Sequence, residues 1–302
     1  MLVGNPLNRS ETVTARHVTV VGGCGSIGRL LLPLWDIDGT RLVVVDRVVG
    51  TVPATVIVGD ITAPTPDVIE AVRDADIVVL ALPESIALQA VSFVADNASP
   101  TALLVETLSV KSHIHQRIAR EAPHLQSVGI NPMFAPALGF SGRPVGAVVH
   151  HTGPAVAPFL HALTSCGARV VELSADEHDR RCAATQALTH AAVLTFGLAL
   201  ANLGVAGEEL TTIATPPHNA MLALLSRVAG GLPEVYLDIQ SGNPYAVDAR
   251  KAFASAAAEL SDVVDRGGER EFGELMTRAM SPLADQGEAF RATCTRMIAA
   301  LP

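Results

Sequence analysis

The sequence predicts an α/β protein in which a Rossmann-type, doubly wound parallel sheet is followed by an all-helical domain. Short runs rich in Val, Ile and Leu recur through the first half, without the two-residue alternation of a sheet that has one wet face. Helix-like stretches separate these runs, which is the pattern of a parallel sheet. Strand signals end before residue 175. We therefore expect a sheet domain at 1–174 and a helical domain at 175–302.

The predicted elements follow one another in a regular order. After a short polar extension, the buried strands are expected within 17–23, 41–47, 54–60, 76–83, 102–109, 126–132, 146–151 and 168–174. The helical patterns between them include 25–35, 65–75 and 84–97. The second domain is expected to consist of helices within 177–204, 207–230, 235–242, 243–267 and 269–301.

Composition excludes several partners. The formal net charge is -9 and Lys/Arg-rich runs are absent, which argues against nucleic-acid binding. The N-terminal residues lack the apolar region of a signal peptide, so a cytoplasmic location is expected. The uncharged segment 187–206 is long enough for a membrane span. It contains several polar side chains, however, and we expect a helix buried on most sides in a core or subunit interface, with no membrane partner.

A dinucleotide fingerprint opens the chain. GxGxxG occurs directly after the first predicted strand and at the start of a helix, where glycines let the backbone approach a pyrophosphate. At the end of the second strand, Asp46 can accept both ribose hydroxyls of NAD, while the adjacent Arg47 leaves NADP as a lesser alternative. The expected cofactor is NAD, bound by Gly23, Cys24, Gly25, Ser26, Ile27, Gly28, Asp46, Arg47, Leu82 and Pro83.

Seven motifs in order give the chain a family resemblance. VVGGCGSIGRLL, DIVVLALPESIALQAV, LLVETLSVKS, VGINPMFAP, CGARVVELSADEHD, QALTHAAVLTFG and VYLDIQSGNP resemble the prephenate and arogenate dehydrogenases of tyrosine biosynthesis. The resemblance implies an NAD-binding domain, a helical domain that forms a homodimer, and an active site in the cleft between the domains. It also implies hydride transfer from C4 of a cyclohexadiene to the nicotinamide while the ring loses a carboxylate as carbon dioxide.

The resemblance also assigns site residues. It implies that Ser109 hydrogen-bonds the C4 substituent, and that Gln186 and His190 of QALTH lie over the substrate. The position of the family's catalytic histidine falls on Asn131. Where the family has an arginine that binds a substrate carboxylate, ATPPHNAML places Asn219, with His218 beside it. Arg250 and Arg227 are alternative carboxylate anchors.

Structural roles are the alternatives at four of these positions, and Arg250 could simply be a surface residue of its helix. Ser109 follows a predicted strand and could cap the next helix. Asn131 could be a turn residue before Pro132, a common role of Asn-Pro. His190 lies in an apolar helix, where a histidine could be a hydrogen-bonded core residue.

The asparagine at position 131 changes the expected substrate. Removing hydride from a carbon that bears a hydroxyl requires a base for the O–H proton, and such a base contributes about 10²- to 10⁴-fold. The Asn131 amide has no basic lone pair near neutral pH. An amine at C4 supplies its own lone pair, so 4-amino-4-deoxyprephenate is the expected substrate and 4-aminophenylpyruvate the product. A branch of the family with this activity makes antibiotic precursors.

Two other functions stay open. The substrate could be prephenate or arogenate, with another group, His190 first, acting as the base. Alternatively the chain could be a catalytically silent NAD-binding regulatory homologue, although the retained fingerprint, Ser109 and QALTH argue against silence.

Other titratable residues are expected to be structural. The pairs His113/His115 and His150/His151 lack partners at metal-ligand spacing and are expected to be solvated or capping residues, so no metal is predicted. The carboxylates of SADEHD suit the start of a helix.

Overall fold

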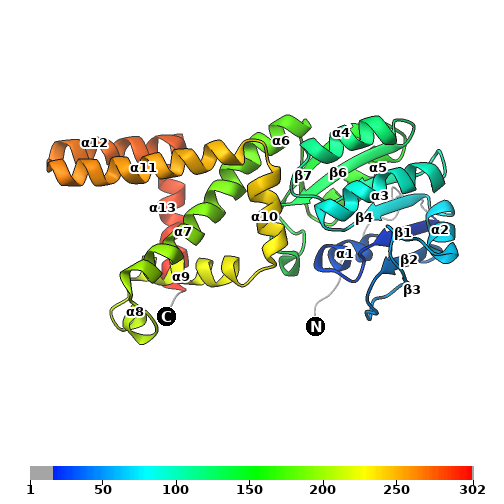
Figure 1. The fold of residues 1–302 in the computed structure, drawn as a ribbon, viewed down its shortest axis with the longest axis horizontal. Coiled ribbons are helices and arrows are strands. Elements are labelled where there is room, and N and C mark those ends of the chain that lie inside the picture. Colours follow the sequence, from blue (N-terminus) through cyan, green and yellow to red (C-terminus); the bar gives the residue numbers. More distant parts are fainter. Residues whose placement is uncertain (1–15, 301–302) are drawn as a thin grey trace. The chain divides into compact units, whose positions relative to one another are not determined.

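The computed structural model describes residues 16–300, and the predicted N-terminal extension lies outside them apart from Arg16. The chain forms two compact units, Met1–Arg180 and Arg181–Pro302, each considered by itself (Figure 1). The first carries a sheet between helices and the second is helical, so the predicted fold class is confirmed.

The first unit is built on a single sheet of eight strands in the order β3-β2-β1-β4-β5-β6-β7-β8. Neighbouring strands are parallel except β6 and β7, which pair antiparallel, so the sheet is predominantly parallel. All eight predicted strands are present: β1 His17–Val21, β2 Arg41–Asp46, β3 Thr55–Val58, β4 Ile77–Leu80, β5 Leu103–Glu106, β6 Gln126–Pro132, β7 Pro144–His151 and β8 Arg169–Glu172.

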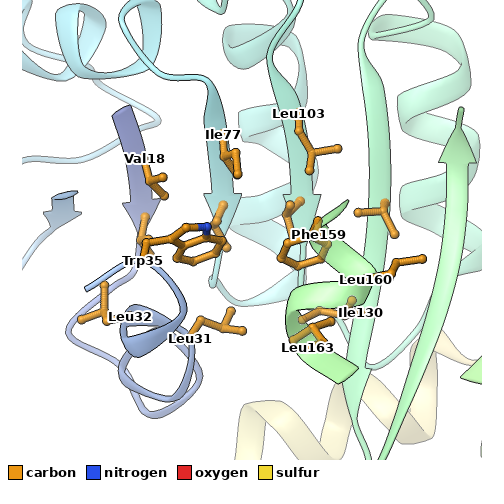
Figure 2. Close-up of a cluster of buried hydrophobic side chains, with 14 of the residues drawn as sticks. Val18, Leu31, Leu32, Trp35, Ile77, Leu103, Ile130, Phe159, Leu160 and Leu163 are labelled. Atoms are coloured by element: carbon orange, nitrogen blue, oxygen red, sulfur yellow. The ribbon is translucent and has the colours of Figure 1, made fainter. Parts of the chain in front are cut away.

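Helices cover both faces of the sheet because alternate strand residues point to opposite sides. One face packs against α1 (Ser26–Leu31), η2 (Leu32–Leu34) and α5 (Val156–Ser165). Trp35 and Phe159 stack there with ring centroids 6.1 Å apart, in the same buried cluster as strand residues such as Leu103 (Figure 2). The other face packs against α2 (Pro66–Arg73), α3 (Glu84–Asn97) and α4 (Ser112–Glu121). Apolar side chains on both faces explain the continuous hydrophobic runs in the sequence.

Two glycines shape the turn between β1 and α1. Gly22 has φ +79°, and a Cβ there would lie 2.1 Å from the carbonyl oxygen of Ala81. A Cβ on Gly28 would lie 2.5 Å from the carbonyl oxygen of Gly22. Side chains at either position would force this turn open, so the glycines bring the turn and the helix close together.

The second unit begins within one continuous helical segment. α6 (Ala175–Cys182) leads into a π-helical turn, η4 (Ala183–Ala187), and then into α7 (Leu188–Leu203). It continues with α8 Glu208–Thr212, α9 Pro216–Ala229, α10 Pro233–Gly242, α11 Ala246–Arg266, α12 Glu269–Met280, η5 Ser281–Gln286 and α13 Gly287–Ala299 (Figure 1).

Helix α7 is more exposed to solvent than predicted. The segment Ala175–Leu203 is long and apolar enough to pass as a membrane span, a test that core helices of soluble proteins also pass. Only 17% of its most apolar window is buried within the chain, and Leu198 and Leu203 are 65% and 73% exposed. The expectation of a helix buried on most sides is therefore wrong for a single chain. An apolar surface of this kind is typical of a subunit interface.

We expect Leu103→Ala to lower the free energy of unfolding of the sheet unit by about 2–5 kcal/mol, because it leaves a cavity beside the stacked rings. Leu103 is fully buried, and Trp35, the single tryptophan, lies in the same cluster. Urea unfolding followed by tryptophan fluorescence measures the change. Leu138→Ala is the matched control, since Leu138 is 55% exposed and its loss should cost under about 0.5 kcal/mol. Equal effects of the two changes would contradict this view of the core.

Candidate active site

A hollow at the carboxyl ends of β1, β2 and β4 contains much of the predicted cofactor site. Six of the expected residues line it: Cys24, Gly25, Asp46, Arg47, Leu82 and Pro83. Gly23 and Gly28 lie beneath it in the turn, where Gly23 packs against Val44. Ser26 and Ile27 form the first turn of α1. Such a crevice at the carboxyl ends of parallel strands is where doubly wound sheets bind nucleotides.

Asp46 is held in place at the rim of this hollow. One carboxylate oxygen accepts a hydrogen bond from the Cys24 N–H at 2.9 Å, and the other accepts one from the Val48 N–H at 3.2 Å. Burial and then the nearby Asp46 carboxylate raise the pKa of the Cys24 thiol, so the thiol stays protonated at neutral pH. Arg47 is exposed beside Asp46. The tight turn and the fixed carboxylate fit the phosphates and ribose of a dinucleotide.

Asn131 lies near the end of β6 and is only 3% exposed. Its side-chain nitrogen lies 3.2 Å from Nε2 of His178. The ring of His178 lies in turn 2.8 Å, through Nδ1, from a carboxylate oxygen of Asp179. A loop-turn role for Asn131 before Pro132 does not describe this environment, since the side chain belongs to a buried hydrogen-bonded chain.

The backbone that carries Asn131 is held by a buried ion pair. The Lys111 ammonium donates to both oxygens of Glu106, at 2.8 and 2.9 Å, and to the carbonyl oxygen of Ile130 at 3.0 Å. Both side chains are fully buried. Burial would raise the pKa of Glu106, but the positive charge of Lys111 and the hydrogen bond from His150 outweigh it and hold the pKa below its ordinary value. The pair thus joins β5 to the residue before Asn131.

Two histidines extend the hydrogen-bonded contacts of this ion pair toward the protein surface. His150 Nε2 lies 3.0 Å from Glu106, and His150 Nδ1 lies 3.0 Å from Nδ1 of half-buried His115. The expectation that His115 and His150 are solvated or capping residues is wrong, because Glu106 draws His150 into the interior. Gly129 makes room for this contact, since a Cβ there would lie 1.7 Å from Glu106 Oε1 and 2.8 Å from His150 Nε2.

Asp179 ties α6 to the start of α4. Its carboxylate accepts hydrogen bonds from the backbone N–H groups of Lys111 and Ser112, both at 2.8 Å, and from the Ser112 hydroxyl at 2.5 Å. Burial alone would raise the pKa of Asp179, but these donors and His178 lower it. Asp179 therefore caps α4, the role that the sequence left open for Ser109. Ser109 itself is partly exposed in the segment between β5 and α4.

Two of the predicted site residues lie in the second unit, and each carries a buried polar atom that is unsatisfied. Gln186 lies in the π-helical turn and His190 in the first turn of α7. Gln186 Oε1 and His190 Nδ1 are both buried, and neither has a hydrogen-bond partner among residues 16–300. Buried polar atoms are normally satisfied, so each exception needs an explanation, and a bound ligand is one way to supply the missing partner. π-helical turns are also frequent at functional sites.

Arg227, not Arg250, lies on the His190 side of this unit. Burial and then the charge of Arg227 lower the pKa of His190, so its ring is neutral at pH 7. Arg227 is exposed in the last turn of α9, and Tyr236 packs edge-on against His190 with centroids 4.8 Å apart. Arg250 instead donates to the backbone and side-chain oxygens of Gln240, at 2.5 and 2.9 Å.

The predicted pair His218 and Asn219 begins α9. The His218 N–H bonds the Thr215 hydroxyl at 3.4 Å, and its ring packs against Phe196 of α7 with centroids 5.8 Å apart. Phe196 is six residues beyond His190, about 9 Å along the helix. Asn219 is partly buried in the same turn. These two residues therefore lie farther along α7 than the unsatisfied atoms.

Sequence reasoning missed the buried network and the ring that packs on His190. Glu106, Lys111, His178 and Tyr236 were not among the candidate site residues. A signal existed for the first two, since a charged residue ends the apolar run LLVE and Lys111 is one of only two lysines. Nothing in the sequence ranked Arg227 above Arg250, because the place of α9 beside α7 appears only when the helices pack together.

Two family models match the chain. Residues 39–147 match the model described as prephenate dehydrogenase, nucleotide-binding domain. Residues 174–278 match the model described as prephenate dehydrogenase, dimerization domain. The matches fall on the sheet unit and on the helical unit, respectively, with the second beginning just before α6.

Individual relatives agree with these matches. The chain is 46% identical, over 97% of its length and 99% of the relative's, to a 4-amino-4-deoxyprephenate dehydrogenase from Streptomyces pristinaespiralis. It is 26% identical, over 91% of its length and 69% of the relative's, to a T-protein from Enterobacter agglomerans. Prephenate dehydrogenase from Aquifex aeolicus shares the fold, with a TM-score of 0.67, 16% identity and coverage of 88% of this chain and 98% of that one.

We expect Lys111→Met to lower the free energy of unfolding of the sheet unit by about 3–5 kcal/mol, because it leaves the Glu106 carboxylate buried without its cation. Urea unfolding followed by Trp35 fluorescence measures the loss. Lys251→Met is the matched control, since Lys251 is exposed on α11 and should change stability by under about 0.5 kcal/mol.

The pH dependence has a defined sign. The folded pKa of Glu106 lies below its ordinary value of 4.5, so its stabilising contribution is present above pH 4.5 and is lost as pH falls through the folded pKa. A Lys111→Met protein as stable as the parent at pH 7 would contradict the role given to the ion pair.

Proposed function

The chain belongs to the prephenate dehydrogenase family, and we propose that it oxidises 4-amino-4-deoxyprephenate to 4-aminophenylpyruvate and carbon dioxide, with NAD as the hydride acceptor. The observation that carries the proposal is the buried asparagine at the end of β6, within a chain 46% identical to a relative that bears this activity in its name. Asn131 cannot take a proton at neutral pH, so the substrate has to do without a base at this position.

An amine at C4 meets that requirement. Its neutral nitrogen donates a lone pair into the carbon that loses hydride, and the positive charge of the iminium-like centre is neutralised when the ring loses its carboxylate as carbon dioxide, which leaves the aromatic amine. An amino group has an ordinary pKa of about 8, so a usable fraction is neutral at pH 7 to 8. A hydroxyl substrate would instead forfeit the roughly 10²- to 10⁴-fold that a positioned base contributes. A neutral amide also avoids the repulsion that a protonated histidine would exert on an ammonium group.

The nucleotide hollow favours NAD over NADP. The close turn at Gly22 and Gly28 leaves space for a pyrophosphate that a Cβ at either glycine would disturb. The Asp46 carboxylate, fixed by the Cys24 and Val48 N–H groups, is placed to accept ribose hydroxyls and to repel a 2'-phosphate. Arg47 beside it can stack on an adenine ring. The bound nicotinamide supplies the acceptor for the hydride.

In this proposal, a cation of the helical unit binds a carboxylate of the substrate. Arg227 supports that role better than Arg250, because its charge acts on His190 while Arg250 is bonded to Gln240. Gln186 Oε1 and His190 Nδ1 offer further unsatisfied atoms for substrate polar groups. Ser109, His218 and Asn219 remain candidate contacts. In this proposal neutral His190 orients the substrate and does not act as the base.

The same unit supports a homodimer. The match to a dimerization-domain model falls on it, and the exposed apolar side chains of α7, with Leu198 and Leu203 among them, give a second copy a surface to bury. A cytoplasmic location fits a dehydrogenase that uses a soluble nicotinamide cofactor and a small dicarboxylate substrate.

The deciding experiment is NADH formation by the purified protein with prephenate, arogenate and 4-amino-4-deoxyprephenate, each with NAD and with NADP. We expect turnover of the amino compound with NAD to exceed turnover of prephenate by about 10²-fold or more. Prephenate turnover at a similar kcat/KM would contradict the proposal and direct attention to another proton acceptor. Silence on all three substrates would favour the regulatory homologue. Asn131→His should raise prephenate turnover if the pocket accepts a hydroxyl.

We expect Arg227→Gln to raise the KM for the amino substrate by about tenfold or more, because a charged hydrogen bond to a carboxylate contributes about 1.5–3 kcal/mol. The KM for NAD should stay unchanged. Arg250→Gln is the matched control on the same unit, and steady-state kinetics on both variants separate the candidates. A larger effect of Arg250→Gln would reverse this assignment of the carboxylate anchor.

A further inference from the structure

The side chains of Asn131, His178 and Asp179 form a hydrogen-bonded series. The protonation of the series can be assigned starting from Asp179. Asp179 accepts hydrogen bonds from two backbone N–H groups and the Ser112 hydroxyl, so its carboxylate is ionised and acts only as an acceptor. The His178 nitrogen that faces it, Nδ1 at 2.8 Å, must therefore carry a proton.

The proton on Nδ1 determines the state of the His178 ring and the orientation of the Asn131 amide. His178 is buried, and desolvation lowers its pKa more than the hydrogen bond and charge of Asp179 raise it, with Lys111 lowering it further. A neutral ring with its proton on Nδ1 has a bare lone pair on Nε2. The Asn131 nitrogen at 3.2 Å must then be the donor to Nε2. This fixes which way the amide points: its NH₂ group faces His178, and its carbonyl oxygen is directed away from the imidazole.

We propose that His178 is a positioning residue that holds the Asn131 amide with its carbonyl oxygen, an acceptor, presented to the substrate's C4 amino group. This inference rests on the proposed function. A carbonyl oxygen can accept an N–H of the amine and stabilise the positive charge that develops on nitrogen as hydride leaves, which is electrostatic stabilisation of the transition state by a fixed dipole. The reversed amide would direct two N–H groups at a substrate group that is itself a donor.

Protonation of His178 reverses this arrangement. With protons on both nitrogens, the ring can no longer accept from Asn131, and the amide must rotate so that its oxygen faces the imidazolium. The charged or titratable groups around the ring are Asp179 on its own helix, Lys111 before α4 and Glu106 on β5, with Gly146 of β7 packed against its edge. Lys111 and Glu106 are paired with each other, so His178 is the member of this group of four whose ordinary pKa lies near neutrality.

The test compares His178→Gln and His178→Ala with the full-length parent, with 4-amino-4-deoxyprephenate and NAD. His178→Gln retains an acceptor near the position of Nε2 but cannot titrate, whereas His178→Ala removes the acceptor. We expect His178→Ala to lower kcat by about tenfold to a hundredfold, with little change in the KM for NAD, and His178→Gln to recover most of that loss. If His178 served only to bond Asp179 through Nδ1, a glutamine whose amide replaces the Nε2 end of the ring would not restore kcat.

The pH profile gives the sharper measurement. The ratio of His178→Gln to parent activity cancels the ionisation of the substrate amine, which is common to both enzymes. We expect the ratio to be constant above about pH 7 and to rise as pH falls below the ordinary histidine value of about 6.5. His161→Gln, a change at an exposed histidine of α5, should give a ratio that does not vary with pH. A constant ratio for His178→Gln would overturn the inference.

A separate readout distinguishes failure of this inference from failure of the proposed function. ¹⁵N NMR of histidine-labelled protein without substrate reports the tautomer of His178 whether or not the amino compound is turned over. A proton on Nδ1 at pH 7.5 supports the assigned orientation of Asn131. A proton on Nε2 would overturn it, even if the enzyme proves active on the amino substrate.

Discussion

The buried ion pair between Lys111 and Glu106 is the constraint on which the site of the sheet unit depends. A lysine and a glutamate without exposed surface are costly to bury, and the cost is offset only when hydrogen bonds satisfy the charges. Here the ammonium also binds the Ile130 carbonyl oxygen, so the interaction that neutralises the pair fixes the backbone next to Asn131. The end of β5, the start of α4 and the end of β6 are thereby held as one piece. Asp179 adds α6 to it through the backbone of Lys111 and Ser112.

In the proposed mechanism, this arrangement explains how a weakly reactive side chain can serve beside the reacting carbon. An asparagine on a loose loop would sample both amide orientations and offer a donor as often as an acceptor. In this protein the ionised Asp179 sets the proton on His178, and His178 sets the amide. The hydrogen-bonded residues orient the Asn131 amide, and the substrate's amine contributes the electron pair. Division of labour of this kind suits a substrate that carries its own nucleophilic nitrogen.

The sequence predicted the sheet well because each strand is buried on both faces and reads as an apolar run. It predicted the nucleotide hollow because the glycines and Asp46 lie close together along the chain. The antiparallel direction of β7 left no local signal, since the apolar run of a strand covered on both faces reads the same whichever way the strand points.

The missed residues share a physical cause. His150 and His178 look like surface histidines in the sequence, and only contacts with residues 44 and 47 positions away draw them inside. Arg227 and Arg250 could not be ranked, because the difference lies in which one bonds Gln240 and which one acts on His190 through its charge. The openness of α7 could not be predicted either, since composition does not say whether an apolar helix is covered by its own chain.

Gly129 makes the backbone itself part of this constraint. A Cβ at this position would lie 1.7 Å from Glu106 Oε1, so any other residue at 129 would require the buried Glu106 carboxylate to shift within the ion pair. Two residues farther along β6, the side chain at 131 follows a backbone that the same ion pair holds through the Ile130 carbonyl oxygen. The absence of a side chain at one position of the strand therefore helps to fix the direction of the side chain at another.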